Sequence, residues 1–406
     1  MNRRLRVLSL INELHYVGGG ENRLFSFALT VDRSRIDHTV ASFRSDDSDK
    51  HPYFPARLQA AGVSVRTFGI GPASAAGERR NIVRGTLNLS RKIKWLSHLI
   101  RELEIDLVDA HLDPAILVGV LSGLLTRVRK VVTVYEAQPF PPSTLRTLSR
   151  RITFRLADAI ITDSQARSDD IRTVIGRTKR RIAVIPNGIP PPIPNLPSDQ
   201  MRRMLNIPGG DETIVIGQVS RLVPFKGHSV LLDAARTVVD KHSNAFFLVI
   251  GYEADKGYKE KLVQQAAALG LSDRVRITGY AGPIGDVWQL IDLHVHASLF
   301  DSLPNAIIEG MSLHKPAVVT AVGGIPEAVE HDVTGLIVPP GNTEALSAAL
   351  LKLLREPETA GKLGNAAYKR YEERYRAEIM SAKLQDFFED VVSAKEESPY
   401  ALPASG

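Results

Sequence analysis

Two kinds of hydrophobic pattern alternate along the chain. Short apolar runs rich in Val and Ile, typical of buried strands, are separated by segments whose apolar residues recur with the period of an amphipathic helix. Strands are predicted at residues 6–11, 38–43, 63–67, 107–110, 130–135, 159–162 and 182–186, and then at 213–219, 245–250, 275–278, 293–297 and 317–320. Helices are predicted at 22–31, 80–103, 145–156, 229–242, 259–269, 284–291, 306–313 and 344–355. This alternation predicts an α/β protein with two doubly wound parallel sheets, each covered by helices on both faces.

A proline-rich segment separates the two halves of the chain. Five of the nine residues from Ile189 to Pro197 are proline, which suits neither a helix interior nor the middle of a sheet. The charge changes at the same place, because residues 1–190 carry a net charge of +12 and residues 191–406 one of −6. We therefore predict an interdomain linker here. The polar, Pro-containing end from Ser393 onward is predicted to be frayed.

Composition narrows the class of protein. The 406 residues are 44% hydrophobic and 24% charged, as in soluble folded proteins, and no stretch approaches the roughly 20 apolar residues of a membrane span. The first residues lack the pattern of a signal peptide. The chain has no cysteine, which excludes disulfides, thiolate metal sites and cysteine nucleophiles and fits a reducing compartment. These features predict a cytoplasmic protein.

Three consecutive glycines follow the first predicted strand. Gly18, Gly19 and Gly20 precede Glu21 and a predicted helix, so their backbone N–H groups could approach a phosphate at the positive end of that helix. Taken alone, such a loop could equally be a tight turn. It lacks the spacing Gly-x-Gly-x-x-Gly, so a nicotinamide cofactor is not predicted.

Three further loops follow strands of the second half. Arg221 and Lys226 come after one strand, and two cations at one strand end suit a clamp on a diphosphate, although either could be a plain surface residue. Asp301 precedes a helix that contains Glu309, whose apolar neighbours predict a buried carboxylate in need of a partner such as a ribose or sugar diol. The glycine pair 323–324 opens another helix and could hold phosphate or sugar oxygens. Together the loops indicate a nucleotide-diphosphate ligand.

These residues resemble the motifs of glycosyltransferase family 4, the retaining group 1 glycosyltransferases of GT-B fold. Six segments carry the resemblance in family order over about 375 residues: 18–21 (GGGE), 184–189 (VIPNGI), Arg221 with Lys226, Asp301 with Glu309, 323–327 (GGIPE) and 335–341 (GLIVPPG). The resemblance implies two facing Rossmann-like domains with a central cleft. An acceptor-binding domain would span 1–190 and a donor-binding domain 191–375, a helix at 376–392 would cross back to the first domain, and 393–406 would be a flexible tail.

The resemblance also implies roles for individual residues. Arg221 and Lys226 would grip the donor diphosphate, Glu309 would hold the ribose hydroxyls, and Asp301 would contact hydroxyls of the transferred sugar. Further donor contacts are implied at Gly19, Gly20, Gly279, Tyr280, Leu303, Asn305, Gly323, Gly324 and Ile325. The candidate catalytic residues are Asp301, His111, Arg221 and Lys226, and no metal site is predicted.

Three positions depart from the family pattern. Asp301 stands where Glu is frequent, Pro190 stands where Asp is usual, and Tyr135 stands where a His of the catalytic site is frequent. His111, after the predicted strand 107–110, is the nearest substitute for that His, although it could equally be a structural histidine. On the acceptor side the candidates are His15, Tyr135 and Glu136.

The family implies a retaining, metal-independent glycosyltransferase without a bound cofactor. Its co-substrate would be a nucleotide-diphosphate sugar, a UDP-sugar first and a GDP-sugar second, and its acceptor a glycan, a lipid-linked glycan or a small molecule, in polysaccharide or other glycoconjugate biosynthesis. A catalytically degenerate partner subunit that binds nucleotide sugars, or a sugar-nucleotide epimerase of similar fold, remains an alternative. Nucleic acid is not predicted as a partner, because the basic half interleaves few aromatic residues with its cations.

Two basic helical segments of the first half suggest an anionic membrane surface as a further partner. In both, the apolar stripe is predicted to pack on the sheet and to leave the cations outside. The protein would then be peripheral on the inner face of the cell membrane; an idle basic surface is the alternative. The stripes are Ile82, Leu89, Ile93, Leu96, Ile100 and Leu103, and Leu145, Leu148, Ile152 and Leu156; the cations are Arg79, Arg80, Arg84, Arg91, Lys92 and Lys94, and Arg146, Arg150, Arg151 and Arg155.

Overall fold

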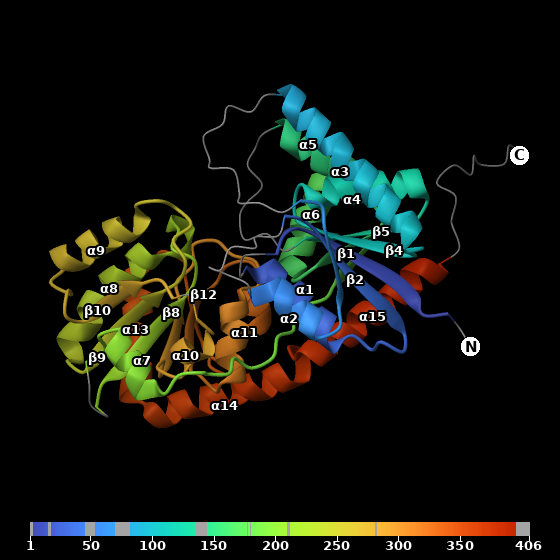
Figure 1. The fold of residues 1–406 in the computed structure, drawn as a ribbon. Coiled ribbons are helices and arrows are strands. Elements are labelled where there is room, and N and C mark those ends of the chain that lie inside the picture. Colours follow the sequence, from blue (N-terminus) through green and yellow to red (C-terminus); the bar gives the residue numbers. More distant parts are fainter. Residues whose placement is uncertain are drawn as a thin grey trace, which may run out of the picture.

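Two parallel sheets organise the molecule (Figure 1). The computed structural model describes residues 3–14, 18–44, 53–69, 82–134, 144–176, 178, 180–208, 212–280 and 282–394. The first sheet has the order β3-β2-β1-β4-β5-β6-β7, with β1 (Leu5–Glu13), β2 (Ile36–Arg44), β3 (Ser64–Thr67), β4 (Leu107–His111), β5 (Arg129–Val134), β6 (Ala159–Thr162) and β7 (Arg181–Val184). The second has the order β10-β9-β8-β11-β12-β13, with β8 (Ile214–Val219), β9 (Ala245–Ile250), β10 (Val275–Thr278), β11 (Leu293–His296), β12 (Ala317–Thr320) and β13 (Leu336–Val338).

Helices connect successive strands and cover the sheets. Those of the first half are α1 (Gly19–Thr30), α2 (Tyr53–Ala60), α3 (Ile82–Glu102), α4 (Ala115–Thr126), α5 (Thr144–Leu156) and α6 (Gln165–Ile175). The second half has α7 (Ser198–Met204), the 3-10 turn η1 (Pro224–Lys226), α8 (His228–Lys241), α9 (Tyr258–Ala268), α10 (Gly285–Trp288), α11 (Asn305–Ser312), α12 (Ile325–Ala328) and α13 (Thr343–Arg355). Neighbouring strands pair in parallel in both sheets, so the predicted α/β class with two Rossmann-like parallel sheets is confirmed.

The sequence pattern missed several elements for identifiable reasons. Helix α4 is apolar almost throughout and buried along most of its length, so it has no polar face to reveal a helical period. Helix α6 is mostly polar, and its apolar residues lie mainly in its second half. The three-residue strand β13 is too short for an alternating pattern to stand out.

The end of the chain forms two long helices that lie along different domains (Figure 1). Helix α14 (Pro357–Arg374) packs against α11 in the second half, where Tyr371 joins the hydrophobic core. The backbone is extended at Arg376, and α15 (Ala377–Ser393) then buries Leu384 and Phe388 against the first sheet. Arg35 adds a bidentate ion pair with Glu389, at 2.9 and 2.8 Å. Helix α15 therefore ties the C-terminal part of the chain to the first sheet.

Helix α5 departs from the predicted packing at two positions. Leu148 and Ile152 are 52% and 49% exposed, although their stripe was predicted to be core. Arg150 is instead 3% exposed, and its Nε donates to Asp113 Oδ2 at 2.7 Å. The prediction is therefore wrong for Leu148 and Ile152, whereas Leu156 packs against the core cluster that contains Phe154. The side chain of Leu145 lies outside the described ones. The stripe of α3 does pack inward through Leu96 and its neighbours among the described side chains.

Candidate functional site

The loop between β8 and α8 carries the two predicted cations. Arg221 is partly exposed, whereas Lys226 at the end of η1 is buried. Gly227 follows with a φ of +69°, and a Cβ atom there would lie 1.9 Å from the carbonyl oxygen of Ala297. Only glycine therefore allows this loop to reach the end of β11, which brings Lys226 to the next loop of the sheet edge.

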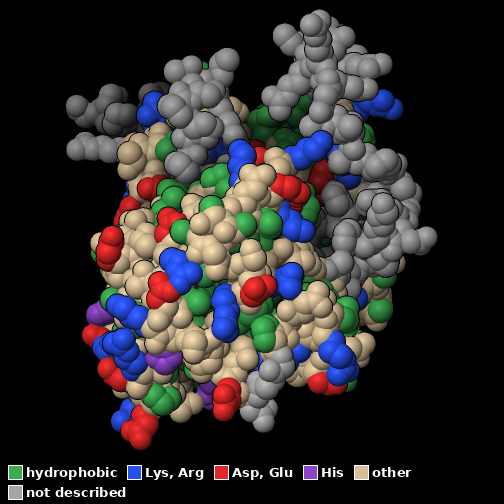
Figure 2. Space-filling view, turned by 90° about the vertical axis from the view of Figure 1, so that its left-hand side faces the viewer, with side chains coloured by type: hydrophobic (Ala, Val, Ile, Leu, Met, Phe, Trp, Pro, Cys, Tyr) green, Lys and Arg blue, Asp and Glu red, His purple; other side chains and the backbone are tan. Residues whose placement is uncertain are grey.

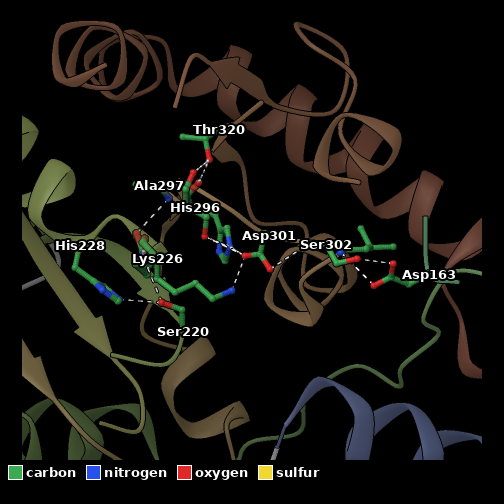
Figure 3. Close-up of polar contacts among 12 residues, drawn as sticks. Asp163, Ser220, Lys226, His228, His296, Ala297, Asp301, Ser302 and Thr320 are labelled. Atoms are coloured by element: carbon green, nitrogen blue, oxygen red, sulfur yellow. Dashed lines mark hydrogen bonds and ion pairs between the residues drawn. The ribbon is translucent and has the colours of Figure 1, made fainter. Parts of the chain in front are cut away.

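Lys226 meets Asp301 in a buried ion pair (Figure 3). Lys226 Nζ donates to Asp301 Oδ2 at 2.5 Å. The same oxygen lies 2.9 Å from His296 Nε2 and accepts from Ser298 Oγ at 3.0 Å. The other oxygen, Oδ1, accepts from the backbone N–H of Ser302 at 3.1 Å. Lys226 of the predicted clamp and the first predicted acid thus form one cluster, in which the Asp301 carboxylate fixes where the Lys226 ammonium points.

The charges of this cluster follow from its burial. Burial alone would raise the pKa of Asp301, but the Lys226 ammonium and the hydrogen bond from His296 hold that pKa well below its ordinary value. Burial lowers the pKa of His296, against the opposing hydrogen bond to Asp301. Because an ionised carboxylate can only accept, His296 donates to it from Nε2. Burial and then the charge of Lys226 lower the pKa of His228 to about 3, so this second ring is neutral.

Glu309 lies on α11, where its carboxyl is buried among apolar side chains. Burial raises the pKa of Glu309 to about 7, although a hydrogen bond from Trp288 opposes the shift. Trp288 Nε1 donates to Glu309 Oε2 at 2.7 Å. The sequence predicted that this buried carboxylate needs a partner, and the structure supplies an indole N–H. When ionised, the carboxylate can accept further hydrogen bonds, as a diol would require.

The loop between β12 and α12 packs directly on the Asp301 loop. Gly323 has a φ of +51°, and a Cβ atom there would lie 2.1 Å from the carbonyl oxygen of Asp301. The N–H of Gly324 donates to the carbonyl oxygen of Ser302 at 2.9 Å. Ile325 begins α12 and is fully buried. These predicted residues therefore lie beside Asp301 and hold its loop in place.

The glycine loop of the first half touches the same region. Asn305, at the start of α11, accepts from Asn187 Nδ2 at 2.9 Å and donates to the carbonyl oxygen of Gly19 at 3.4 Å. Burial raises the pKa of Glu21 to about 7, opposed by hydrogen bonds from its own backbone and by the attraction of Arg221. Gly19 is exposed and Gly20 is buried. The loops at the carboxyl edges of both sheets thus meet where the sequence predicted a donor site.

The remaining predicted residues make contacts of their own. His111 is buried, with Nε2 2.7 Å from Asp109 Oδ2, and Asp109 also accepts from Thr133 Oγ1 at 2.6 Å. Tyr280 follows the exposed Gly279 and donates to Asp286 Oδ2 at 2.5 Å; burial, then this bond, raises its pKa. The acceptor-side candidates His15, Tyr135 and Glu136 lie outside the described residues.

Two residues to which the sequence reasoning gave no role join this edge. Asp163, directly after β6, accepts from Ser302 Oγ at 2.6 Å and from the N–H of Leu303 at 3.3 Å. Glu327 on α12 accepts from the N–H groups of Gln165 and Ala166 at 2.7 and 2.8 Å, which caps α6 from the other half of the chain. The signal for Asp163 was present, because a residue that directly follows a parallel strand lies at the carboxyl edge of the sheet.

Two family models match the chain. The model described as Glycosyltransferase Family 4 matches residues 17–191, and the model described as Glycosyl transferases group 1 matches residues 199–370. The chain is 30% identical to the alpha-D-kanosaminyltransferase of Streptomyces kanamyceticus over 161 residues, which are 39% of this chain and 41% of that protein. It is 23% identical to the D-inositol 3-phosphate glycosyltransferase of Kribbella flavida over 338 residues, 77% of this chain and 78% of that protein.

The fold is also shared with a solved glycosyltransferase structure. HepE from Anabaena, in complex with UDP and glucose, superposes with a TM-score of 0.77 at 22% identity, and covers 95% of this chain and 100% of its own. At this identity the likeness concerns the fold, which is the two-domain GT-B arrangement.

Proposed function

This chain belongs to glycosyltransferase family 4, the group 1 glycosyltransferases, and we propose that it transfers a sugar from a nucleotide-diphosphate sugar to an acceptor hydroxyl with retention of the anomeric configuration. A UDP-sugar is the first donor to test and a GDP-sugar the second. HepE was solved with UDP-glucose as well as with UDP and glucose, which supports this order. The product would be a polysaccharide or another glycoconjugate.

One observation carries the proposal: the buried pair of Lys226 and Asp301. The pair brings together an oriented cation and a buried carboxylate on neighbouring strand ends of one sheet. Arg221 adds a second, more accessible cation on the same loop, and Glu309 adds a carboxyl on the helix that follows Asp301. This set suits a ligand that combines a diphosphate with hydroxyl-rich sugars.

The proposed reaction exchanges one bond at the anomeric carbon for another. The bond to the diphosphate oxygen breaks, the acceptor oxygen bonds on the same face of the sugar, and the departing phosphate takes the acceptor proton. Arg221 and Lys226 stabilise the negative charge that grows on the diphosphate. Asp301 holds Lys226 in position and accepts from sugar hydroxyls, while ionised Glu309 accepts from the ribose.

A donor panel with an Arg221→Ala variant tests the proposal. The wild type is expected to transfer sugar from a UDP- or GDP-sugar, and loss of the Arg221 contact is expected to slow turnover by at least about 30-fold, or about 2 kcal/mol. Arg236→Ala, which removes an exposed arginine of α8, is the matched control and should keep wild-type turnover.

Three results would count against this assignment. Undiminished turnover in Arg221→Ala would remove that residue from the clamp. Donor binding without hydrolysis or transfer to any acceptor would favour a degenerate partner subunit. Conversion of the donor to an epimer would identify a sugar-nucleotide epimerase.

The exposed face of α5 favours a lipid-linked acceptor at an anionic membrane surface. Leu148 and Ile152 lie one turn apart on this face, with the exposed Arg151 and Arg155 beside them. None of the described helices combines the length and hydropathy of a membrane-spanning segment. The face of the second domain seen in Figure 2 has Lys and Arg interspersed with Asp and Glu, so a surface of mixed sign lies there. We therefore assign the membrane contact to α5, with the protein peripheral on the inner face of the cell membrane.

Sedimentation with vesicles tests the role of α5. Binding is expected with equal parts of phosphatidylglycerol and phosphatidylcholine, to weaken with salt, and to be absent with phosphatidylcholine alone. The Leu148→Ser/Ile152→Ser variant should bind at least about tenfold more weakly, because each inserted side chain contributes about 1.5–3 kcal/mol. Val263→Ser/Val333→Ser removes two comparably exposed side chains of the second domain and should bind like the wild type. Equal binding of both variants to the anionic vesicles would exclude α5 as the membrane contact. Failure of the wild type to bind even at low salt would favour a soluble acceptor.

A further inference from the structure

Asp163 reaches from the first domain into the donor loop of the second. It follows β6, is 2% exposed, and its Oδ1 accepts from Ser302 Oγ at 2.6 Å while its Oδ2 accepts from the N–H of Leu303 at 3.3 Å. Ser164 Oγ supplies a third donor at 3.0 Å. Figure 3 shows Asp163 and Asp301 on opposite sides of Ser302. The two carboxylates are thus separated by one residue that bonds to both.

Ser302 is the point at which the contacts converge. Its hydroxyl donates to Asp163, its N–H donates to Asp301 Oδ1, and its carbonyl oxygen accepts from the N–H of Gly324. A change in the position of Ser302 therefore moves both Asp301 and the glycine pair 323–324. Asp301 in turn holds the Lys226 ammonium, so the chain of contacts extends from the first domain to the diphosphate clamp.

The approach of the two domains at this point is close and well defined. A Cβ atom on Gly324 would lie 2.4 Å from the Cβ atom of Ser164, so a glycine is required where the two edges touch. Glu327 caps the first N–H groups of α6 beside this contact. Asp163 is therefore fixed in the first domain, directly opposite the loop that it contacts.

We propose that Asp163 is a positioning residue that sets the donor loop through Ser302 when the two domains are in contact. The loop 301–303 acquires its geometry from a carboxylate of the other domain, so Asp301 and Lys226 reach their reactive arrangement only in the closed molecule. The sugar-handling role of this loop rests on the proposed function, whereas its anchoring by Asp163 does not.

The electrostatics of Asp163 agree with this role. Burial raises the pKa of Asp163, and the hydrogen bonds from Ser302 and Ser164 oppose that shift. A buried carboxylate is costly unless its hydrogen bonds are made, so Asp163 and Ser302 stabilise each other and act as one unit.

Hydrogen exchange tests the anchoring without any substrate. In Asp163→Ala, peptides that contain Leu303 and Gly324 are expected to exchange at least about tenfold faster than in the wild type, because the local opening of the loop is no longer opposed. Peptides from β9 should be unchanged. Asp169→Ala, which removes an exposed carboxylate of the adjacent helix α6, is the matched control. Unchanged exchange at both segments would overturn the proposal whether or not the protein proves to be a transferase.

Kinetics with the accepted donor tests the consequence. We expect turnover to fall by roughly 10- to 100-fold in Asp163→Ala and in Ser302→Ala, since both remove the hydrogen bond between Ser302 and the buried Asp163 carboxylate. Asp163→Ala also removes the bonds from Leu303 and Ser164. The UDP dissociation constant should stay within about threefold of the wild type, and Asp163→Asn, which keeps an acceptor oxygen for Ser302, should recover part of the loss. The double variant Asp163→Ala/Ser302→Ala should lose no more turnover than the more impaired single variant, because both substitutions remove the same hydrogen bond.

Two kinetic outcomes would overturn the positioning role. If the fold reductions in turnover of the two single variants multiply in the double variant, the two residues act separately. A parallel fall in UDP affinity and turnover would show general damage to the donor domain. If Asp163→Ala fails to fold, Ser302→Ala and Asp163→Asn carry the same tests.

Discussion

Replacing Lys226 by methionine should destabilise the protein and nearly abolish turnover. Lys226 and Asp301 are both buried, and their ion pair neutralises two charges that are almost fully removed from solvent. Removing one partner leaves an uncompensated carboxylate, which typically costs about 3–5 kcal/mol in the free energy of unfolding. Loss of the cation from the diphosphate clamp adds at least about 2 kcal/mol to the barrier of the proposed reaction. Urea denaturation measures the first effect, and turnover of the accepted donor the second.

A second substitution separates these two effects. Lys226→Met/Asp301→Asn removes both charges, so its unfolding free energy should recover most of the loss while its turnover stays low. Lys352→Met is the control, because Lys352 forms an exposed ion pair with Asp332 at 3.1 Å and should change the unfolding free energy by less than about 1 kcal/mol. A double variant as unstable as Lys226→Met would contradict the view that the unpaired Asp301 causes the loss.

The rule that ligands bind at the carboxyl ends of parallel strands explains why the sequence located this site. Arg221, Lys226 and Asp301 could be placed at one edge from the strand pattern alone, and β8, β11 and β12 are neighbours in the sheet. The pattern could not show that Lys226 and Asp301 bond to each other, because strand ends fix the backbone and not the direction of a side chain. The buried ring of His296 had no signal either, since it lies within the strand β11 itself.

Long-range pairing explains the other differences. The stripe on α5 predicted a helix correctly, but its Leu148 and Ile152 face outward. Arg150 is buried instead and pairs with Asp113, which lies 37 positions earlier in the chain. Asp163 carries no motif of its own and gains its role only because Ser302 and Leu303, 139 and 140 residues further on, fold against it. Both features arise from contacts that local sequence reasoning cannot see.

Above neutral pH, Glu309→Gln is expected to stabilise the protein relative to the wild type. Burial raises the pKa of Glu309 from 4.5 to about 7, so the folded protein holds this proton more tightly than the unfolded chain. The contribution of Glu309 to stability is therefore full below about pH 4.5 and is lost as the pH rises through about 7. The shift corresponds to about 3 kcal/mol. Urea denaturation at pH 4.5 and pH 8 measures this effect. At each pH the unfolding free energy of Glu309→Gln is compared with that of the wild type, and the contributions of all other titrating groups cancel in this difference.

Nucleotide binding shows whether this buried carboxyl also serves the ligand. If ribose hydroxyls donate to ionised Glu309, UDP binding at pH 7 should release up to roughly half a proton, because the free carboxyl is about half protonated there. Calorimetry in two buffers of different ionisation enthalpy measures the release, and Glu309→Gln should abolish it and weaken UDP binding. Glu309→Gln could instead lose the pH-dependent part of its stability and still bind UDP with unchanged affinity and unchanged proton release. Glu309 would then have only a structural role, through its hydrogen bond with Trp288. Loss of both the proton release and the UDP affinity would support a place for the carboxyl in the donor site, since the ionisation of Glu309 would then be coupled to nucleotide binding.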